Sequence, residues 1–324
     1  MNRSRVVGIA LVVISAISFG SGGLFARPAY AAGIDWLTLM AWRFLLAGGL
    51  AWAVLLASPS ARRALRAMPP RTLLTAVGLG VYYLSNTATY FAGITTTPLS
   101  LAALIVYVYP PIVAVLALRF GRPLKGRRAW TALGIALLGV VLAVGGISAS
   151  QMPPLGGLLL VIAAPLLYSV WIIMAARHAG ETSEAVGSAT AGAADATVAG
   201  AVMLSSTGVA YWLICAVLGH PVLPGDIPSA AWPGIVGVGV VSGFVAVQFF
   251  YAGAQRVGAA QASLLSTVEP LWTITAAGIL LGERLTPVQL LGGVLILVGV
   301  VLSQTGPRGE QAELPQPVLR LGED

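Results

Sequence analysis

Two ionisable side chains, Arg43 and Glu269, lie deep inside long hydrophobic stretches of this chain. A charge at such depth in a lipid bilayer is costly, so residues of this kind are candidates for a functional site. Arg43 could hold a carboxylate through its planar guanidinium, and Glu269 could attract an amine or carry a proton. The two could instead form a structural ion pair, which would lower the desolvation cost of each. The sequence leaves these alternatives open.

Polar residues recur at helical spacing in these stretches. Ser266 and Thr273 lie three and four positions from Glu269, which places all three on one face of a helix. A second polar stripe recurs in the same way elsewhere: Tyr82, Asn86, Thr89 and Tyr90. Contact with lipid would leave these groups without hydrogen bonds, so we expect both stripes to face the protein interior. There they either line a substrate cavity or hydrogen-bond neighbouring helices.

Prolines and aromatic residues extend the candidate site. Pro110 and Pro270 lie inside hydrophobic stretches, where each removes a backbone hydrogen bond and can kink a helix. The preceding residues, Tyr109 and Glu269, are therefore expected near a binding pocket. Two further aromatic residues lie three positions apart, too deep for interfacial anchors, and could stack on a substrate or pack in the core: Tyr168 and Trp171.

Residues for enzyme chemistry are scarce. The chain has only two histidines and one cysteine, and its aspartates are dispersed, so neither a zinc-protease helix nor an aspartate cluster for prenyl transfer is present. We expect no catalytic residue, no metal and no cofactor. An integral membrane enzyme remains the alternative from a different functional class.

The composition explains where these residues must lie. The 324 residues are 57% hydrophobic and only 9% charged, whereas soluble domains carry roughly 25% charged residues. So little charge cannot cover a water-soluble particle of this size, and the natural solvent is a bilayer. The basic residues sit in short loops, so the net charge of +7 does not indicate a nucleic-acid partner.

Hydrophobic stretches long enough to cross a bilayer, about 20 residues each, predict an all-α integral membrane protein with ten transmembrane helices. They cover 6–26, 36–57, 72–92, 98–118, 129–147, 155–176, 196–218, 231–251, 259–281 and 287–304. With a cytoplasmic N-terminus, all but three of the 18 Lys and Arg residues fall on the inner side. We therefore expect both termini in the cytoplasm, and a disordered cytoplasmic tail over 305–324.

The second half of the chain repeats the first. Tyr90-Phe-Ala-Gly matches Phe250-Tyr-Ala-Gly, and the same offset pairs Pro110 with Pro270 and the stretch 137–142 with 297–302. The repeats cover 6–147 and 155–304, with five spans each. An odd number of spans inverts the second copy in the membrane, and inverted repeats place a binding site near the midplane.

Several short motifs resemble those of one known family, the EamA transporters of the drug/metabolite transporter superfamily. They are Arg43-Phe44 in the second span, Pro270 in the ninth, the loop Gly282-Glu283-Arg284-Leu285, and the glycine-rich stretch 291–302. The resemblance implies a ten-helix transporter of the bacterial inner (plasma) membrane that exports amino acids or other small metabolites. It also implies a midplane cavity lined by spans 1, 3, 4, 6, 8 and 9.

We therefore expect a secondary transporter, most simply an exporter of amino acids or related metabolites, that alternates access around this cavity. The runner-up is a proton-coupled uptake permease for sugars or nucleotide-type solutes. The expected partners are a small metabolite and membrane lipid, without nucleic acid. The sequence leaves proton coupling and the oligomeric state open.

Overall fold

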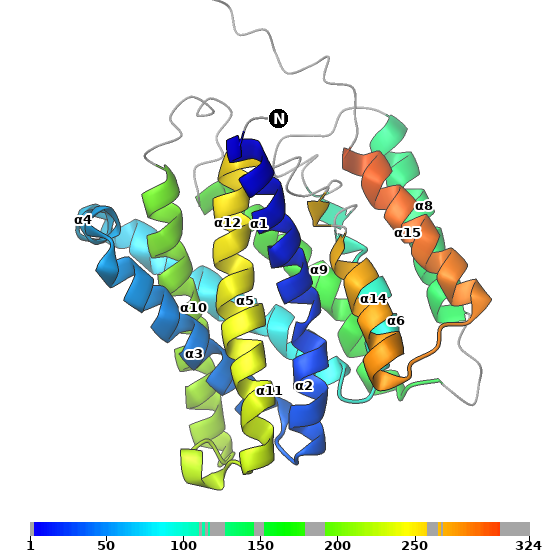
Figure 1. Ribbon diagram of the computed structural model, residues 1–324, viewed down its shortest axis with the longest axis horizontal. Helices are drawn as coiled ribbons and strands as arrows, with labels where there is room; N and C mark the ends of the chain where they lie inside the picture. Colours follow the sequence, from blue (N-terminus) through cyan, green and yellow to red (C-terminus); the bar gives the residue numbers. More distant parts are fainter. Residues whose placement is uncertain are drawn as a thin grey trace, which may run out of the picture.

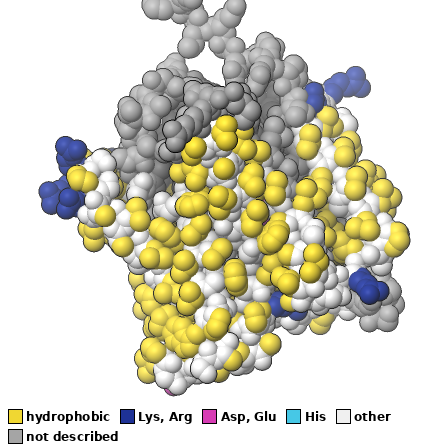
Figure 2. Space-filling model, viewed as in Figure 1, with side chains coloured by type: hydrophobic (Ala, Val, Ile, Leu, Met, Phe, Trp, Pro, Cys, Tyr) yellow, Lys and Arg dark blue, Asp and Glu magenta, His cyan; other side chains and the backbone are white. Residues whose placement is uncertain are grey.

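The computed structural model describes residues 3–109, 112–113, 116, 127–145, 152–178, 192–257, 265–266 and 268–304. All regular secondary structure in these residues is helical. The long helices lie side by side in a bundle, and α1 begins at the edge where α15 ends, the upper edge in Figure 1. Hydrophobic side chains cover the middle of the face in Figure 2, and the arginine side chains seen there lie mainly near its edges. The expected all-α fold is confirmed.

The helices fall into two groups along the chain. The first half contains α1 (Arg3–Gly20), α2 (Gly22–Ala31), α3 (Trp36–Ala57), α4 (Pro59–Ala67), α5 (Pro70–Gly93), α6 (Leu99–Val106) and α8 (Arg127–Gly145). The second half contains α9 (Leu155–His178), α10 (Gly192–Leu218), η2 (Pro224–Asp226), η3 (Ser229–Ala231), α11 (Trp232–Val236), the π-helix η4 (Gly237–Val245), α12 (Ala246–Val257), α14 (Val268–Leu281) and α15 (Pro287–Gln304).

Five described segments are long and apolar enough to cross a membrane. They are Val6–Ala31, Trp36–Ala57, Leu155–Met174, Thr197–Leu218 and Ser229–Phe250. Shorter apolar helices cover Trp130–Leu142, Val268–Leu281 and Pro287–Gly299. α5 has 24 residues, enough to span, but its polar stripe makes it less hydrophobic. A multi-pass membrane protein is borne out, while the count of ten spans stays a prediction.

Several predicted spans are interrupted rather than continuous. The first breaks at Ser21, between α1 and α2, and the eighth contains the π-helix η4. The fourth was expected over 98–118, but α6 ends at Val106 in a turn. The ninth was expected over 259–281, but the chain turns at Ser266 and α14 begins at Val268. The first and eighth spans nevertheless lie within single apolar segments long enough to cross a membrane, Val6–Ala31 and Ser229–Phe250. In the fourth and ninth spans the turns at 107–108 and at Ser266 interrupt the helix, and parts of both spans lie outside the described residues.

The structure describes one of the two prolines that were expected to kink helices. Pro270 lies in the first turn of α14, where a proline is tolerated because its missing N–H would have no partner within the helix. It therefore starts a helix instead of bending the middle of one. Pro110, like the tail over 305–324, lies outside the described residues.

A short amphipathic helix, α4, occupies a segment that hydropathy predicts to be a loop. Ser58 caps it by accepting a hydrogen bond from the N–H of Ala61. Ala61 is buried, whereas the arginines at 62, 63 and 66 are exposed. A helix with one apolar face and one basic face suits the boundary between lipid and water.

The pairing of helices relates the two halves. The main contacts join α1 with α12 and α5 with α9, and also join α3 with α10, α6 with α14, and α8 with α15. Exchanging the halves converts the α1–α12 pair into the α9–α5 pair and maps the α3–α10 and α8–α15 pairs onto themselves. Every one of these contacts crosses from one half to the other, so the two halves pack against each other along most of their long helices.

Glycines at equivalent positions allow the closest approach. A Cβ atom on Gly139 of α8 would lie 2.6 Å from the carbonyl oxygen of Gly292 in α15, and one on Gly299 of α15 would lie 2.7 Å from that of Ala132 in α8. These contacts are related by the offset of the sequence repeat, since it carries Gly139 to Gly299 and Ala132 to Gly292. The matched glycines therefore serve the same purpose in both halves.

The repeated Ala-Gly motif has the same explanation. A Cβ on Gly93 of α5 would contact Val161 and the carbonyl oxygen of Gly157 in α9, the latter at 3.2 Å. A Cβ on Gly253 of α12 would lie 2.9 Å from the carbonyl oxygen of Gly8 in α1. Each motif ends in a glycine because a neighbouring helix backbone passes directly over it.

Substitution of Gly139 by alanine should therefore weaken the contact between α8 and α15. Overpacking of this kind costs about 1–3 kcal/mol, and we expect a lower midpoint of thermal unfolding in detergent. A Cβ added to Gly134, on the same helix, would have open space around it to 4 Å. Gly134→Ala should leave the midpoint unchanged or raise it slightly, and equal effects of the two substitutions would contradict this account of the contact.

The start of α3 is held by a carboxylate outside the membrane span. Asp35 Oδ1 accepts hydrogen bonds from the N–H groups of Leu37 at 2.7 Å and Thr38 at 3.0 Å, and Oδ2 accepts one from Thr38 Oγ1 at 2.7 Å. His220 Nδ1 lies 3.2 Å from Oδ2. Partial burial acts to raise the pKa of Asp35, but the bonds from Thr38 and the contact with His220 outweigh it and lower the pKa.

Because folding lowers the pKa of Asp35, its ionised form stabilises the folded protein at any pH above the pKa that Asp35 has in the unfolded chain. This contribution to the free energy of unfolding is lost as the pH falls through the lower pKa of the folded protein. The thermal midpoint should therefore drop on acidification below about pH 4, the ordinary range of an aspartate. Asp35→Asn should start from a lower midpoint at neutral pH and lose less on acidification. Parallel pH profiles for the two proteins would show that Asp35 does not contribute in this way.

Candidate functional site

Arg43 is buried without a carboxylate beside it. It lies on α3 with 5% of its surface exposed, and its Nε atom has no hydrogen-bond partner. Its guanidinium carbon lies 4.7 Å from the ring centre of Phe91 and 5.4 Å from that of Phe44. The described ion pairs are Arg27–Glu283 and Asp35–His220. The structural pair of Arg43 with Glu269, one of the two alternatives from the sequence, is therefore not formed.

Glu269 lies where two interrupted helices meet. Tyr107, in the turn that ends α6, donates a hydrogen bond from its hydroxyl to the Glu269 carboxylate, with 3.0 Å between the oxygens. The same hydroxyl is 2.7 Å from the carbonyl oxygen of Ser266, in the turn before α14. The breaks in the two equivalent spans thus contact each other at the only carboxylate predicted to lie deep in the membrane.

A continuous series of aromatic rings connects Tyr107 with Phe44. The centroid distances are 5.8 Å for Tyr107–Tyr109, 4.9 Å for Tyr109–Tyr168, 5.8 Å for Tyr168–Trp171, 4.8 Å for Trp171–Tyr83 and 6.1 Å for Tyr83–Phe44. We call these six residues the aromatic series. They come from α3, α5, α9 and the end of α6, so four helices turn rings toward one another between Glu269 and Arg43.

Three residues expected near the pocket belong to this series: Tyr109, Tyr168 and Trp171. Trp171 Nε1 donates a hydrogen bond to the carbonyl oxygen of Leu79 at 3.1 Å, which attaches α9 to α5. Ser169 Oγ is 3.2 Å from the carbonyl oxygen of Tyr109. Each of the three aromatic side chains is only half-buried, so part of each ring is accessible from outside the protein.

On α5, residues adjacent to the expected polar stripe also contact other helices. Tyr83, not Tyr82, joins the aromatic series, and Thr87 Oγ1 lies 2.9 Å from the hydroxyl of Tyr211 on α10. Tyr90 packs edge-on against Phe91, the ring next to Arg43.

The remaining members of that stripe make local contacts. Thr89 donates to carbonyl oxygens of its own helix, those of Ser85 and Asn86. Among the described residues, no ring contact or hydrogen bond links the side chains of Tyr82 and Asn86 to the aromatic series. Their contact with substrate stays a prediction.

Thr273 joins two helices. Its hydroxyl is 3.0 Å from the carbonyl oxygen of Gly20, and next to it Trp272 Nε1 donates to Ser21 Oγ at 2.9 Å. A Cβ on Gly20 would lie 2.9 Å from the carbonyl oxygen of Glu269. These contacts place the break between α1 and α2 against the start of α14, and they support the helix-packing alternative for Thr273.

Sequence reasoning missed Tyr107, Tyr83 and the rings around Arg43. Their signal was weak, because a tyrosine in an apolar helix looks the same whether it faces lipid or the interior. Tyr83 and Tyr90 lie within electrostatic reach of both Arg43 and Glu269. The arrangement thus holds one cation and one carboxylate apart, with aromatic walls between them. In the described part of the chain, no three His, Cys, Asp or Glu side chains could hold a metal.

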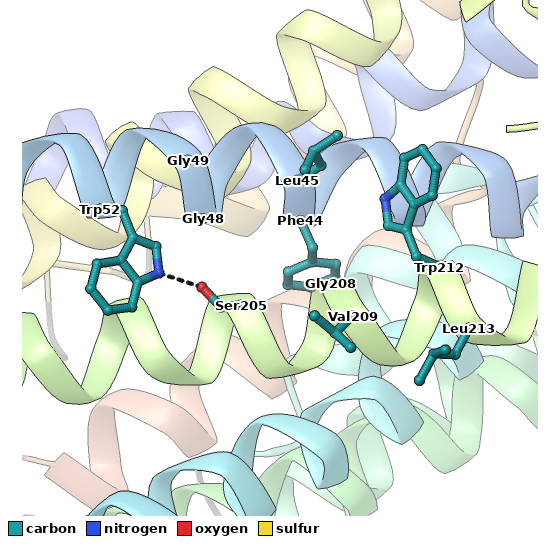
Figure 3. Close-up of a pocket in the computed structure, with 10 residues that line it drawn as sticks. All are labelled: Phe44, Leu45, Gly48, Gly49, Trp52, Ser205, Gly208, Val209, Trp212 and Leu213. Atoms are coloured by element: carbon teal, nitrogen blue, oxygen red, sulfur yellow. Dashed lines mark hydrogen bonds between the residues drawn. The ribbon is translucent and has the colours of Figure 1, made fainter. Parts of the chain in front are cut away.

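A separate groove of about 590 Å³ lies between α3 and α10 (Figure 3). Its lining is mainly apolar: Phe44, Leu45, Gly48, Gly49, Trp52, Ser205, Gly208, Val209, Trp212 and Leu213. Trp52 Nε1 donates a hydrogen bond to Ser205 Oγ at 2.7 Å, as drawn in Figure 3. Leu45, Val209 and Leu213 are among the exposed hydrophobic residues. This groove therefore opens toward lipid, and Phe44 is the one residue that it shares with the aromatic series.

Comparisons with known proteins agree with this arrangement. An uncharacterized transporter of Archaeoglobus fulgidus is 26% identical over 301 residues, which cover 93% of this chain and 97% of the relative. The uncharacterized transporter YcbK of Bacillus subtilis is 24% identical over 309 residues, covering 91% and 93%. A solved crystal structure shares the fold with a TM-score of 0.62 at 17% identity, covering 91% of this chain and 96% of that one. The model of the EamA-like transporter family matches residues 6–145 and 155–305. The chain therefore belongs to the EamA-like transporter family and carries two copies of its repeat.

Proposed function

We propose that this membrane transporter exports amino acids or related small zwitterionic metabolites across the bacterial inner membrane. The observation that carries the proposal is the separated pair of charges: buried Arg43 without a carboxylate, and Glu269 at the meeting point of two helix breaks. A guanidinium suits a carboxylate, and a carboxylate suits an amine. The aromatic series between them offers apolar contact to the rest of the substrate.

The proposed mechanism is alternating access between inverted five-helix repeats, with ten spans in total and both termini in the cytoplasm. Three features support it. The α3–α10 and α8–α15 contacts map onto themselves when the halves are exchanged, and the α1–α12 contact maps onto the α9–α5 contact. The breaks in the fourth and ninth spans meet at Glu269, and interrupted helices mark the binding sites of many such transporters. An odd number of spans per repeat inverts the second copy.

Purified protein in liposomes provides the direct test. A mixture of labelled amino acids, sugars and nucleosides would be loaded inside or outside, with and without a pH gradient, and transport measured for each compound. The proposal expects movement of a zwitterionic metabolite. Movement of sugars or nucleosides alone would replace it with the uptake alternative.

Proton coupling is the second candidate feature, and the hydrogen bond between Glu269 and Tyr107 favours it. A carboxylate that exchanges a proton while it changes partners can link substrate movement to a pH gradient. Coupling predicts that an imposed gradient accelerates transport of the same metabolite in one direction only.

Substitution of Glu269 by glutamine should reduce transport at least about tenfold, because a charge-assisted contact contributes roughly 1.5–3 kcal/mol. Expression and the thermal midpoint should stay close to those of the parent protein. Asp226→Asn serves as the control, because it neutralises an exposed carboxylate in the short helix η2, away from the candidate site. Unaltered transport by Glu269→Gln at every pH would exclude both substrate binding and proton coupling by this residue.

Substitution of Arg43 by methionine separates a binding role from a structural one. A buried charge without an anionic partner is unfavourable in the empty protein, so its removal should raise the free energy of unfolding by on the order of 1 kcal/mol. Transport should fall at the same time. A lower thermal midpoint for Arg43→Met would instead identify Arg43 as a structural residue held by its ring contacts.

A further inference from the structure

A second polar cluster joins the two halves of the chain at the edge of the bundle where α2 and α14 end, the lower edge in Figure 1. The first half contributes Arg27 of α2 and three residues around the start of α6, and the second half contributes Glu283, just after α14. We call these five residues the Glu283 cluster: Arg27, Thr97, Leu99, Ser100 and Glu283.

Glu283 supplies the cap that α6 lacks. Pro98 stands at the N-cap position of α6 and provides no side-chain hydrogen bond. Glu283 Oε1 accepts a bond from the N–H of Leu99 at 2.9 Å, and Oε2 accepts bonds from Ser100 N and Ser100 Oγ, both at 2.8 Å. Gly282, with a φ of 68°, turns the chain after α14 and brings Glu283 to this position.

Arg27 completes the cluster. Its Nη2 atom donates a hydrogen bond to the carbonyl oxygen of Thr97 at 2.7 Å and lies 3.7 Å from Glu283 Oε1. The side chains of Arg27 and Glu283 are 29% and 16% exposed, so water reaches the cluster from one side. Glu283 is thus held by two kinds of positive partner, a guanidinium and the N-terminus of a helix.

We propose that the Glu283 cluster holds one face of the transporter closed and must separate each time that face opens. Every contact of the Glu283 carboxylate described above is with a residue of the first half, so separation of the halves at this face breaks all of them together. The inference rests on the proposed transport function, because only halves that move apart require a contact that can break. The face is the outer one, since the basic residues of the chain place the loops after α2 and α14 outside.

The side chain of Thr97, a buried member of the cluster, can report opening independently of transport. The Thr97 side chain is fully buried, and a Cβ on Gly157 of α9 would lie 3.1 Å from Thr97 Oγ1. Cys215 is the single cysteine of the chain, so Cys215→Ala gives a background free of thiols. In this background Thr97→Cys would be labelled with a membrane-impermeant maleimide in sealed right-side-out vesicles.

Glu283→Gln should accelerate labelling at Thr97→Cys at least about tenfold, because it removes the charge from three short hydrogen bonds. Arg27→Met should have a smaller effect, since it leaves the bonds to α6 in place. Arg284→Gln is the matched control, because it removes a charge from the adjacent position. Equal labelling rates for all variants, or faster labelling only in inside-out vesicles, would overturn the proposal.

A role limited to stability gives a different pattern. If Glu283 only caps α6, Glu283→Gln lowers the thermal midpoint and labelling follows the unfolded fraction, which contradicts the proposal. Should Glu283→Gln fail to fold, Ser100→Ala removes one of the three bonds and should still raise labelling about threefold to tenfold. Transport assays separate the two proposals: accelerated labelling without transport of any metabolite would leave the Glu283 cluster as a closing contact and reject the proposed substrates.

Discussion

Lipid is as apolar as a leucine side chain, so helices in a bilayer associate through close packing and hydrogen bonds rather than through the hydrophobic effect. In this chain the packing is closest at glycines. Gly139 and Gly299 bring α8 and α15 together, and Gly93 and Gly253 bring α5 onto α9 and α12 onto α1. These contacts all cross between the halves, so they join the two copies of the repeat into one bundle.

The same constraint shapes the candidate site. Backbone groups released by a helix break in lipid must find partners within the protein. The Ser266 carbonyl oxygen accepts a hydrogen bond from the N–H of Glu269 at 3.0 Å and also lies 2.7 Å from the hydroxyl of Tyr107, which comes from the break in the equivalent span and contacts the Glu269 carboxylate. The breaks therefore stabilise each other and position a carboxylate between them. Arg43, by contrast, contacts the rings of Phe44 and Phe91 and forms no ion pair with a described carboxylate, which is compatible with the proposed binding of a substrate carboxylate.

Much of the fold could be predicted because hydrophobic length is a strong signal. The second span, 36–57, matches α3 to the residue, and the last span, 287–304, matches α15. The offset of the repeat also identified the glycines that pack equivalently. What failed depended on local partners: the breaks in spans 4 and 9 and the short helix α4 are set by capping and burial, which hydropathy alone does not report.

The candidate site was harder to predict for a related reason. A polar stripe indicates which helix faces inward but not which of two adjacent stripes does so, and Tyr83 and Thr87 are the inward pair on α5. Likewise, Glu283 was noted only as part of a motif. Its carboxylate accepts a hydrogen bond from Leu99, which lies 184 positions earlier in the chain. A local sequence pattern cannot predict a contact between residues so far apart.

The reciprocal contact between α8 and α15 has a consequence for the history of the gene. Gly139 lies against position 292 and Gly299 against position 132. Residue size at each of these positions in one copy is therefore constrained by the residue that it contacts in the other copy. A larger residue acquired by one copy requires a compensating change in its twin. The two copies are therefore not free to diverge independently where α8 packs against α15. Changes in substrate preference are expected in the surrounding helices instead.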